Sequence, residues 1–122
     1  TGGSVLLLGY AYKADLGDTR ETPVEDLADE LIGLGIKPII WDPLVQSDEV
    51  PDRFERIDSL NASPSVDCVV ISTAHRQVLE IDWESLKDIT GCSSIYDGRR
   101  AVNKDVMSKL GWNYSGVGAS ST

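Results

Sequence analysis

Short apolar runs alternate along the chain with segments in which apolar residues recur at helical spacing. Three of the runs are nearly continuous in Val, Leu and Ile, which is typical of strands covered on both faces of a parallel sheet. The pattern predicts four strands and a weaker fifth, at residues 4–9, 37–41, 67–72, 94–96 and 114–117.

Helices are expected between these strands. The clearest covers residues 23–34, where apolar positions share one face and acidic side chains the other. Thr22 and Glu25 predict a capping box at its start, and Gly35 follows its end as a C′ glycine often does. The remaining helices are predicted over residues 78–89, with an interruption near Asp82, over residues 104–110, and as a short turn after Pro51.

Strands that alternate with helices predict right-handed βαβ units. The expected fold is therefore α/β, with a doubly wound, mainly parallel, Rossmann-like sheet in three α/β/α layers. The 122 residues amount to one domain, and we expect residues 1–122 to be a fragment of a longer protein because the chain opens on Thr1-Gly2-Gly3 without an initiator Met.

The connection from the first strand to the first helix, residues 9–23, is too long and too polar for a simple turn. A βα loop in a compact domain needs about two to six residues, so this one indicates a ligand site. Ligands of doubly wound sheets bind beyond the carboxyl ends of the strands. Residues 42–43, 72–75 and 97–100 end the next strands and are expected on the same edge.

The glycine fingerprint GxGxxG of dinucleotide-binding domains does not follow the first strand, where the chain reads Gly-Tyr-Ala-Tyr-Lys over residues 9–13. Two tyrosines would keep a pyrophosphate from the backbone, and carboxylates at the start of the first helix would oppose it. Cationic side chains must then supply the charge for an anionic ligand, and Lys13 and Arg99 are the candidates.

Each cation has an alternative interpretation. Lys13 can reach over the sheet edge to a phosphate beside the flat ring of Tyr12, or it can be a solvated lysine. Arg20 can pair with a neighbouring carboxylate or face a phosphate or another domain's ligand. Arg99 follows a glycine at a strand end, and either it or Arg100 is the working arginine.

The remaining reactive side chains favour structural roles. His75 is expected to form local hydrogen bonds, with a ligand contact as the alternative. Cys68 is expected to be a buried apolar residue and Cys92 a loop or strand-edge thiol. We expect packing roles for the three tryptophans and no metal site, and the sequence offers no catalytic triad or nucleophile elbow.

The net charge of −9, from 20 acidic and 11 basic residues, argues against nucleic acid and anionic membranes as partners. No apolar run approaches the roughly 18 residues of a membrane span, and the two cysteines lack metal or disulfide spacing. We therefore expect a reduced, cytoplasmic domain that binds an anionic small molecule.

Three motifs together resemble the C-terminal, UDP-binding domain of the UDP-glucose/GDP-mannose dehydrogenases. The first is GxAYK followed by DxRETP, the second is WDP at the end of the second strand, and the third is YDGR with a GWxYxGxG close; they occupy residues 9–13, 18–23, 41–43, 96–99 and 111–118. The resemblance spans nearly the whole chain.

The resemblance implies an enzyme that oxidises the C6 hydroxyl of a UDP-sugar to a carboxylate with NAD, through a cysteine outside this chain. It implies that Tyr12, Lys13 and Arg99 contact the nucleotide sugar and that Arg20 reaches NAD, which is held mainly by an N-terminal domain. This chain alone is then inactive, and its partners are the UDP-sugar, the remaining domains and a homo-oligomer. UDP-glucose, UDP-N-acetylhexosamines and GDP-mannose all fit.

Two other hypotheses stay open at this point. One is a flavodoxin-like regulatory module such as a phospho-receiver, which needs a phosphorylatable Asp where this chain has Ser72 and Thr73. The other is a domain that mainly supplies assembly surface to an oligomer.

Overall fold

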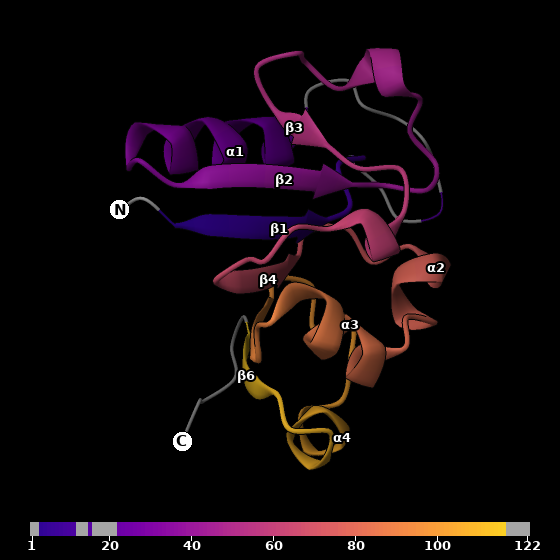
Figure 1. Cartoon of the computed structure of the whole chain (residues 1–122). Helices are drawn as coiled ribbons and strands as arrows, with labels where there is room; N and C mark the ends of the chain where they lie inside the picture. The colour runs from indigo at the N-terminus through magenta and orange to yellow at the C-terminus, as the bar shows by residue number, and fades with distance from the viewer. Residues whose placement is uncertain (1–2, 12–14, 16–21, 117–122) are drawn as a thin grey trace.

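The computed structural model of the chain describes residues 3–11, 15 and 22–116. Its centre is a sheet of six parallel strands in the order β3-β2-β1-β4-β5-β6. The strands are β1 Ser4–Leu8, β2 Lys37–Trp41, β3 Glu55–Arg56, β4 Cys68–Ile71, β5 Ser94–Asp97 and β6 Asn113–Gly116. The strand order reverses between β1 and β4, which confirms the doubly wound α/β fold (Figure 1).

Helices cover the sheet on both faces. Their bounds are α1 Pro23–Gly33, α2 Arg76–Leu79, α3 Trp83–Thr90 and α4 Lys104–Lys109, with short 3-10 helices at Ser47–Glu49 and Leu60–Ala62. Figure 1 shows α1 along β1 and β2, while α3 and α4 lie with the other half of the sheet. The predicted interruption near Asp82 is confirmed, because Asp82 caps α3 after α2 has ended. No helix in the described part of the chain is long and apolar enough to cross a membrane.

Two apolar cores form because successive side chains of a strand point to opposite faces. In β1, Leu6 and Leu8 enter the core shared with α3 and α4, whereas Val5 and Leu7 enter the core under α1. All three tryptophans pack in the first core, as expected, and Trp83 meets Trp112 edge to face at 6.2 Å between ring centroids.

The prediction of a helix after Pro51 is wrong. The 3-10 helix lies before that proline, and residues 51–54 make one turn closed by a 3.0 Å bond from the Phe54 N–H to the Pro51 carbonyl. Phe54 is buried with its ring 6.5 Å from that of Tyr10, and the chain enters β3 at the next residue. Packing of Phe54 and pairing of β3 leave no room for a second helical turn.

The start of α1 differs from the predicted capping box in both of its bonds, because the Thr22 hydroxyl accepts from the second helical residue rather than the third and the Glu25 side chain does not bond back to Thr22. Thr22 is the N-cap, and its hydroxyl accepts a 3.3 Å bond from the Val24 N–H. Glu25 forms an ion pair at 2.6 Å with Arg53, on the connection between β2 and β3, instead of completing the box. Gly35 follows the helix with a φ of 78°, as expected of a C′ glycine.

The two cysteines differ from the prediction in their burial, although Cys92 lies in the loop before β5 as expected. Cys68 is only partly buried, because it lies on the α1 side of β4, whereas Cys92 is buried in the core under α3 and α4. Gly91, with a φ of 66°, ends α3 in the left-handed conformation and turns the chain so that Cys92 enters that core. Burial raises the pKa of both thiols, which favours the neutral form.

Candidate functional site

The carboxyl ends of four neighbouring strands form one edge of the sheet, called the rim below. Leu8 of β1 lies in register with Trp41 of β2 and Ile71 of β4, and Ile71 lies in register with Asp97 of β5. The prediction that these strand ends share one edge is confirmed. The segments after them, residues 9–11, 42–44, 72–75 and 98–102, build the site.

The backbone of residues 9–11, directly after β1, has a partner for each N–H group. The Gly9 N–H donates to the Trp41 carbonyl at 2.7 Å. The Tyr10 and Ala11 N–H groups both donate to Oδ2 of Asp42, at 2.7 and 2.9 Å. These donors are the ones that would otherwise face a phosphate at the end of the first strand.

The carbonyls of residues 9–11 are equally occupied, and each accepts from a hydroxyl. Ser72 donates to the Gly9 carbonyl at 2.6 Å, Thr22 to the Tyr10 carbonyl at 2.7 Å, and Thr73 to the Ala11 carbonyl at 2.7 Å. All three hydroxyl residues are buried, so water does not compete for these bonds. Residues 9–11 are therefore hydrogen-bonded to three other segments: the one after β2, the one after β4 and the residue before α1.

Gly9 is required by this close packing. Its φ is 108°, a conformation that favours glycine, and a Cβ added there would lie 2.4 Å from Cβ of Thr73. The first residue of the GxAYK motif is thus explained by backbone geometry rather than by contact with a ligand.

Asp42 is the centre of the β1 and β2 side of the rim. Besides the two N–H groups of residues 10–11, its Oδ2 lies 2.9 Å from Nε2 of His75, and its Oδ1 accepts from the Leu44 N–H at 2.8 Å. Burial alone would raise the pKa of Asp42, but the hydrogen bonds from His75 and from the three backbone groups outweigh it and hold that pKa below its usual value. The carboxylate is a buried negative charge surrounded by donors.

His75 forms hydrogen bonds within the chain, but its partners lie 33 and 60 residues away in the sequence, so the predicted local bonding at its own loop is wrong. The side chain is fully buried, and its two ring nitrogens face Asp42 and the backbone N–H of Asp15, the latter at 2.8 Å from Nδ1. Both ring nitrogens are occupied within the chain, so His75 is not placed to contact a ligand directly.

The N-terminus of α1 is closed to a phosphate, in agreement with the sequence argument. Thr22 accepts the Val24 N–H, Pro23 has no N–H, and the Glu25 N–H donates to the Thr22 carbonyl at 3.2 Å. The carboxylates of the first turn already complement the helix dipole. Charge for an anionic ligand must come from side chains.

Asp97 organises the β5 side of the rim. It is fully buried; its Oδ1 accepts from the Arg99 N–H at 3.1 Å, and its Oδ2 from the Val102 N–H at 3.0 Å and the Tyr114 hydroxyl at 2.9 Å. Burial and the bond to this carboxylate raise the pKa of Tyr114 to about 12. The loop that carries Arg99 thus wraps around one carboxylate.

Arg99 extends from this loop across the end of β4. Its Nε donates to the Ser72 carbonyl at 2.9 Å, which uses one of the five N–H donors of the guanidinium. The neighbouring Arg100 has a φ of 53° and is not among the described residues that line the pocket below. Of the two arginines that the sequence left as alternatives, the structure brings Arg99 to the rim.

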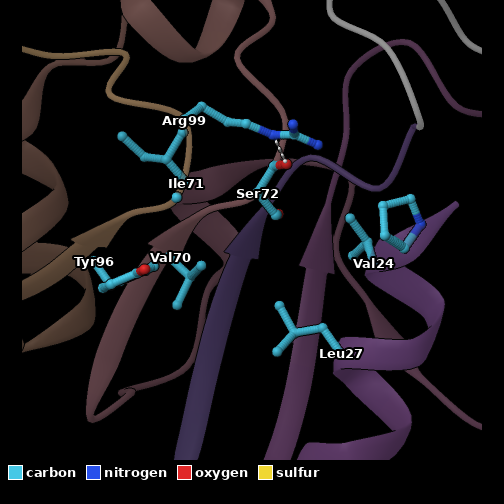
Figure 2. A pocket seen from close by; sticks show the side chains of 9 residues that line it. Val24, Leu27, Val70, Ile71, Ser72, Tyr96 and Arg99 are labelled. Carbon is cyan, nitrogen blue, oxygen red and sulfur yellow. Dashed lines mark hydrogen bonds between the residues drawn. The ribbon is translucent and has the colours of Figure 1, made fainter. Parts of the chain in front are cut away.

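A pocket of about 270 Å³ lies beneath this arginine, between α1 and the α1 side of β4 and β5. Figure 2 shows Val24 and Leu27 of α1 facing Val70 and Tyr96 of the strands, with Arg99 and Ser72 at the mouth. Tyr96 is 40 % exposed. Apolar walls with a few polar groups at one end are typical of small-molecule sites, and this volume is near their lower limit of roughly 300 Å³.

The other predicted contacts, Tyr12, Lys13 and Arg20, lie outside the described residues. Sequence reasoning missed the roles of Asp42 and Asp97 as acceptors, although an aspartate directly after a buried strand, followed by Pro or Gly, is a usable signal. Within residues 3–11, 15 and 22–116, no group of three or more His, Cys, Asp or Glu is placed to hold a metal ion.

Comparison with known protein families gives a match that covers most of the chain. Residues 6–104 match the UDP-binding domain of the UDP-glucose/GDP-mannose dehydrogenase family. The chain belongs to this family. The match includes both sides of the rim.

Individual members of the family agree with this assignment. UDP-glucose 6-dehydrogenase from Rickettsia typhi is 27 % identical over 123 residues, which cover 97 % of this chain and 28 % of that enzyme. The structure of an NDP-N-acetyl-D-galactosaminuronic acid dehydrogenase from Methanosarcina mazei Go1 superimposes with a TM-score of 0.86 at 27 % identity, over 98 % of this chain and 25 % of the other. A UDP-D-ManNAc dehydrogenase from Pyrococcus horikoshii gives 0.75 at 28 % identity, over 95 % and 25 %.

This UDP-binding domain therefore spans about a quarter of the length of the relatives it matches. Its rim, its pocket and Arg99 all lie within the part that these enzymes share with it.

Proposed function

We propose that this chain binds the UDP part of a UDP-sugar, as the C-terminal domain of an NAD-dependent dehydrogenase that oxidises the sugar's C6 hydroxyl to a carboxylate and yields a UDP-uronic acid. The match of residues 6–104 to the family's UDP-binding domain carries this proposal. In it, the chain supplies substrate recognition, while the nucleophilic cysteine and the NAD domain belong to the rest of a longer enzyme.

Arg99 is the proposed contact to the diphosphate. Its guanidinium lies at the mouth of the pocket, and the Nε bond to Ser72 fixes its direction while further N–H donors stay available to phosphate oxygens. The apolar walls, including the Tyr96 ring, suit the flat face of a base or sugar. A local cation is needed because the chain as a whole carries a charge of −9.

Lys13 is proposed as the second phosphate contact, Tyr12 as a contact to the nucleotide sugar, and Arg20 as a contact that reaches NAD across a domain boundary. Their support is the motif match at residues 9–13 and 18–23 and the need for cations on a rim whose backbone N–H groups are already occupied.

The described residues do not form a cradle for NAD itself. The N–H groups after β1 donate to Trp41 and Asp42, and the first turn of α1 is capped by Thr22, so a pyrophosphate finds no backbone donors there. We assign no step of hydride transfer to these residues. The proposal places NAD mainly on another domain, in a cytoplasmic homo-oligomer.

Calorimetric titration of the chain with UDP, and with uridine as the ligand without phosphates, tests the proposal. UDP should bind more tightly than uridine, and Arg99→Ala should weaken UDP binding about 10- to 100-fold, the value of a lost charge-assisted hydrogen bond. Arg100→Ala is the matched control, because it removes the same charge one residue away and should leave UDP affinity nearly unchanged. Equal binding of UDP and uridine, or equal effects of the two substitutions, would contradict the proposed role of Arg99.

A further inference from the structure

The pocket beneath Arg99, called the groove below, has two apolar walls. Figure 2 shows Val24 and Leu27 of α1 on one side and Val70 and Tyr96 on the other, with the arginine at one end. Leu27 and Val70 are only partly buried, and Tyr96 is exposed. These side chains therefore leave apolar surface that an occupant of the groove can cover.

The polar groups that line the groove are used within the chain. The Ser72 hydroxyl donates to the Gly9 carbonyl at 2.6 Å, and the Ser72 N–H donates to the Leu8 carbonyl at 3.1 Å. The Gly98 N–H donates to the Ile71 carbonyl at 3.1 Å. Because β4 pairs with β1 on one side and with β5 on the other, its backbone groups face those strands. The walls thus present carbon atoms and an aromatic ring to an occupant.

Such walls distinguish the base of a nucleotide from its sugar. A hexose carries hydroxyl groups around its ring, and a hydroxyl buried against carbon without a partner is unfavourable. A base has two flat faces and carries its donors and acceptors on its edge. One face can cover the ring of Tyr96 while the edge stays in water. The groove therefore suits a base rather than a sugar.

Gly98 keeps the space between Tyr96 and Arg99 free of a side chain. A Cβ built on this glycine would lie 3.1 Å from the Ile71 carbonyl oxygen and 3.6 Å from Cε2 of Tyr96. The aromatic ring and the guanidinium consequently line the same groove. A ligand in which a flat ring is joined to a diphosphate can contact both.

We infer that Tyr96 stacks on the base of a nucleoside diphosphate whose phosphates bind Arg99, and that this chain recognises the face of the base rather than its edge. The inference rests on the proposed function and deepens it: the groove takes nucleoside diphosphates as a class, with little preference for uracil. Every base has a π face, so stacking tolerates different bases, whereas a site that hydrogen-bonds a ligand's polar groups discriminates strongly. Selection of uracil is then made outside the groove.

Calorimetric titration of the chain with UDP, CDP, ADP and GDP tests recognition of the class. The four Kd values should lie within about tenfold of one another, since tenfold is roughly the effect of one hydrogen bond to a base. A preference for UDP of more than about tenfold would overturn the inference and leave the proposed function standing. If the native chain binds no UDP, the proposed function fails, and the role of Tyr96 fails with it.

Substitutions at Tyr96 test the stacking contact. Tyr96→Ala should weaken UDP binding about 5- to 100-fold, the effect of losing one stacked base, and Tyr96→Phe, which keeps the ring, should change it less than about twofold. Val106→Ala is the matched control, because it shortens another exposed apolar side chain, on α4, and should leave UDP affinity unchanged. Native affinity in Tyr96→Ala would overturn the inference. So would an equal loss in Tyr96→Phe, because it would assign recognition to the hydroxyl.

Inorganic pyrophosphate separates the two contacts because it has no base. Arg99→Ala should weaken its binding, whereas Tyr96→Ala should leave its affinity within about twofold of the native value. A Tyr96 variant that distorted the site would instead weaken pyrophosphate and UDP alike. Equal losses for the two ligands in Tyr96→Ala would therefore overturn the inference, even though UDP binding by the native chain would still support the proposed function.

Discussion

The β1 and β2 side of the rim and the β5 side are each organised by a buried aspartate, but the aspartates take their hydrogen-bond donors from different parts of the chain. On each side a buried aspartate at the end of a strand accepts backbone hydrogen bonds: Asp42, directly after β2, accepts from residues 10–11, and Asp97, the last residue of β5, accepts from Arg99. Asp97 takes its two backbone donors from its own loop, two and five residues ahead. Asp42 takes one backbone donor from Leu44, two residues ahead, and its three other donors from segments 31 to 33 residues away.

This difference separates local from long-range organisation. The loop after Asp97 can form around its carboxylate as soon as β5 exists, with Tyr114 added later from β6. Residues 9–11 after β1 can make their bonds to Asp42, Ser72 and Thr73 only when β1, β2 and β4 are side by side. A substitution at Asp97 should therefore perturb the loop of Arg99, whereas a substitution at Asp42 should perturb the ends of β1, β2 and β4.

The largest effect should come from Asp42→Ala. It leaves four donors of the described residues without their acceptor, three of them backbone groups, and should lower the free energy of unfolding by about 3 kcal/mol or more. Asp97→Ala should lower it less, because the Arg99 end of its loop is exposed and reaches water. Urea unfolding measures both, with exposed Asp88→Ala as the control. Equal losses at Asp42 and Asp97 would contradict the distinction.

The loss of unfolding free energy at low pH should depend on Asp42. Because its pKa is lower in the folded than in the unfolded chain, its stabilisation is complete above the usual value of 3.8 and is lost as pH falls through the lowered native pKa. Urea unfolding from pH 7 to pH 2 should show a shallower acid loss in Asp42→Asn than in the native chain. Part of the slope should remain, since the pKa of Asp29 and of Asp82 is also lowered. An unchanged slope in the variant would refute this assignment.

Tyr114→Phe tests the Asp97 side with a smaller change. It removes one donor to a buried carboxylate and should cost about 1 kcal/mol of unfolding free energy. The pKa of Tyr114 is raised to about 12, so its stabilisation is complete below the usual 10.0 and is lost as pH rises toward 12. Spectrophotometric titration should show one fewer late-ionising tyrosine in the variant, with Tyr10, whose pKa is also raised to about 12, still present.

The smallest effect is expected at Ser72, the residue that joins the two sides. Its hydroxyl donates to the Gly9 carbonyl, while its own carbonyl accepts from Arg99. Ser72→Ala removes the hydroxyl, and with it the bond to the Gly9 carbonyl and the longer one, at 3.2 Å, to the Leu8 carbonyl. It should cost about 0.5–1.5 kcal/mol of unfolding free energy, and UDP affinity should be preserved because the backbone carbonyl that holds Arg99 is unchanged. A loss of UDP affinity as large as in Arg99→Ala would show that the two sides are not separable.

Most of the fold could be predicted from local pattern. The spacing of apolar residues alone predicts β1, β2, β4 and the amphipathic α1. The observed bounds of β2 equal the predicted ones, and those of β1, β4 and α1 differ by at most one residue at each end. The two-residue strand β3, Glu55–Arg56, was missed because it is polar and its pairing with β2 defines it. The turn at residues 51–54 depends on the packing of Phe54 against Tyr10. The residues around position 54 do not predict that long-range contact.

The site was predictable in its location and only partly in its chemistry. The strand ends and Arg99 follow from topology and from a glycine before an arginine. The roles of Asp42 and His75 depend on partners from other segments, up to 60 residues away for His75 and Asp15. Asp97 takes its backbone donors from its own loop and only the Tyr114 hydroxyl from another segment. The closed N-terminus of α1 was predictable because Thr22, Pro23 and the acidic first turn are all local signals.

The bonds around residues 9–11 also bear on how the chain reaches its native state. Their partners Asp42, Ser72 and Thr73 lie 31 to 63 residues along the sequence. Contacts of such separation require large loops to close and form after local helices do. We expect α1 to gain structure before the rim does. A folding intermediate that has helices but lacks the bonds around residues 9–11 would not bind UDP. The rate at which UDP binding returns during refolding would therefore measure the rate of the last folding step.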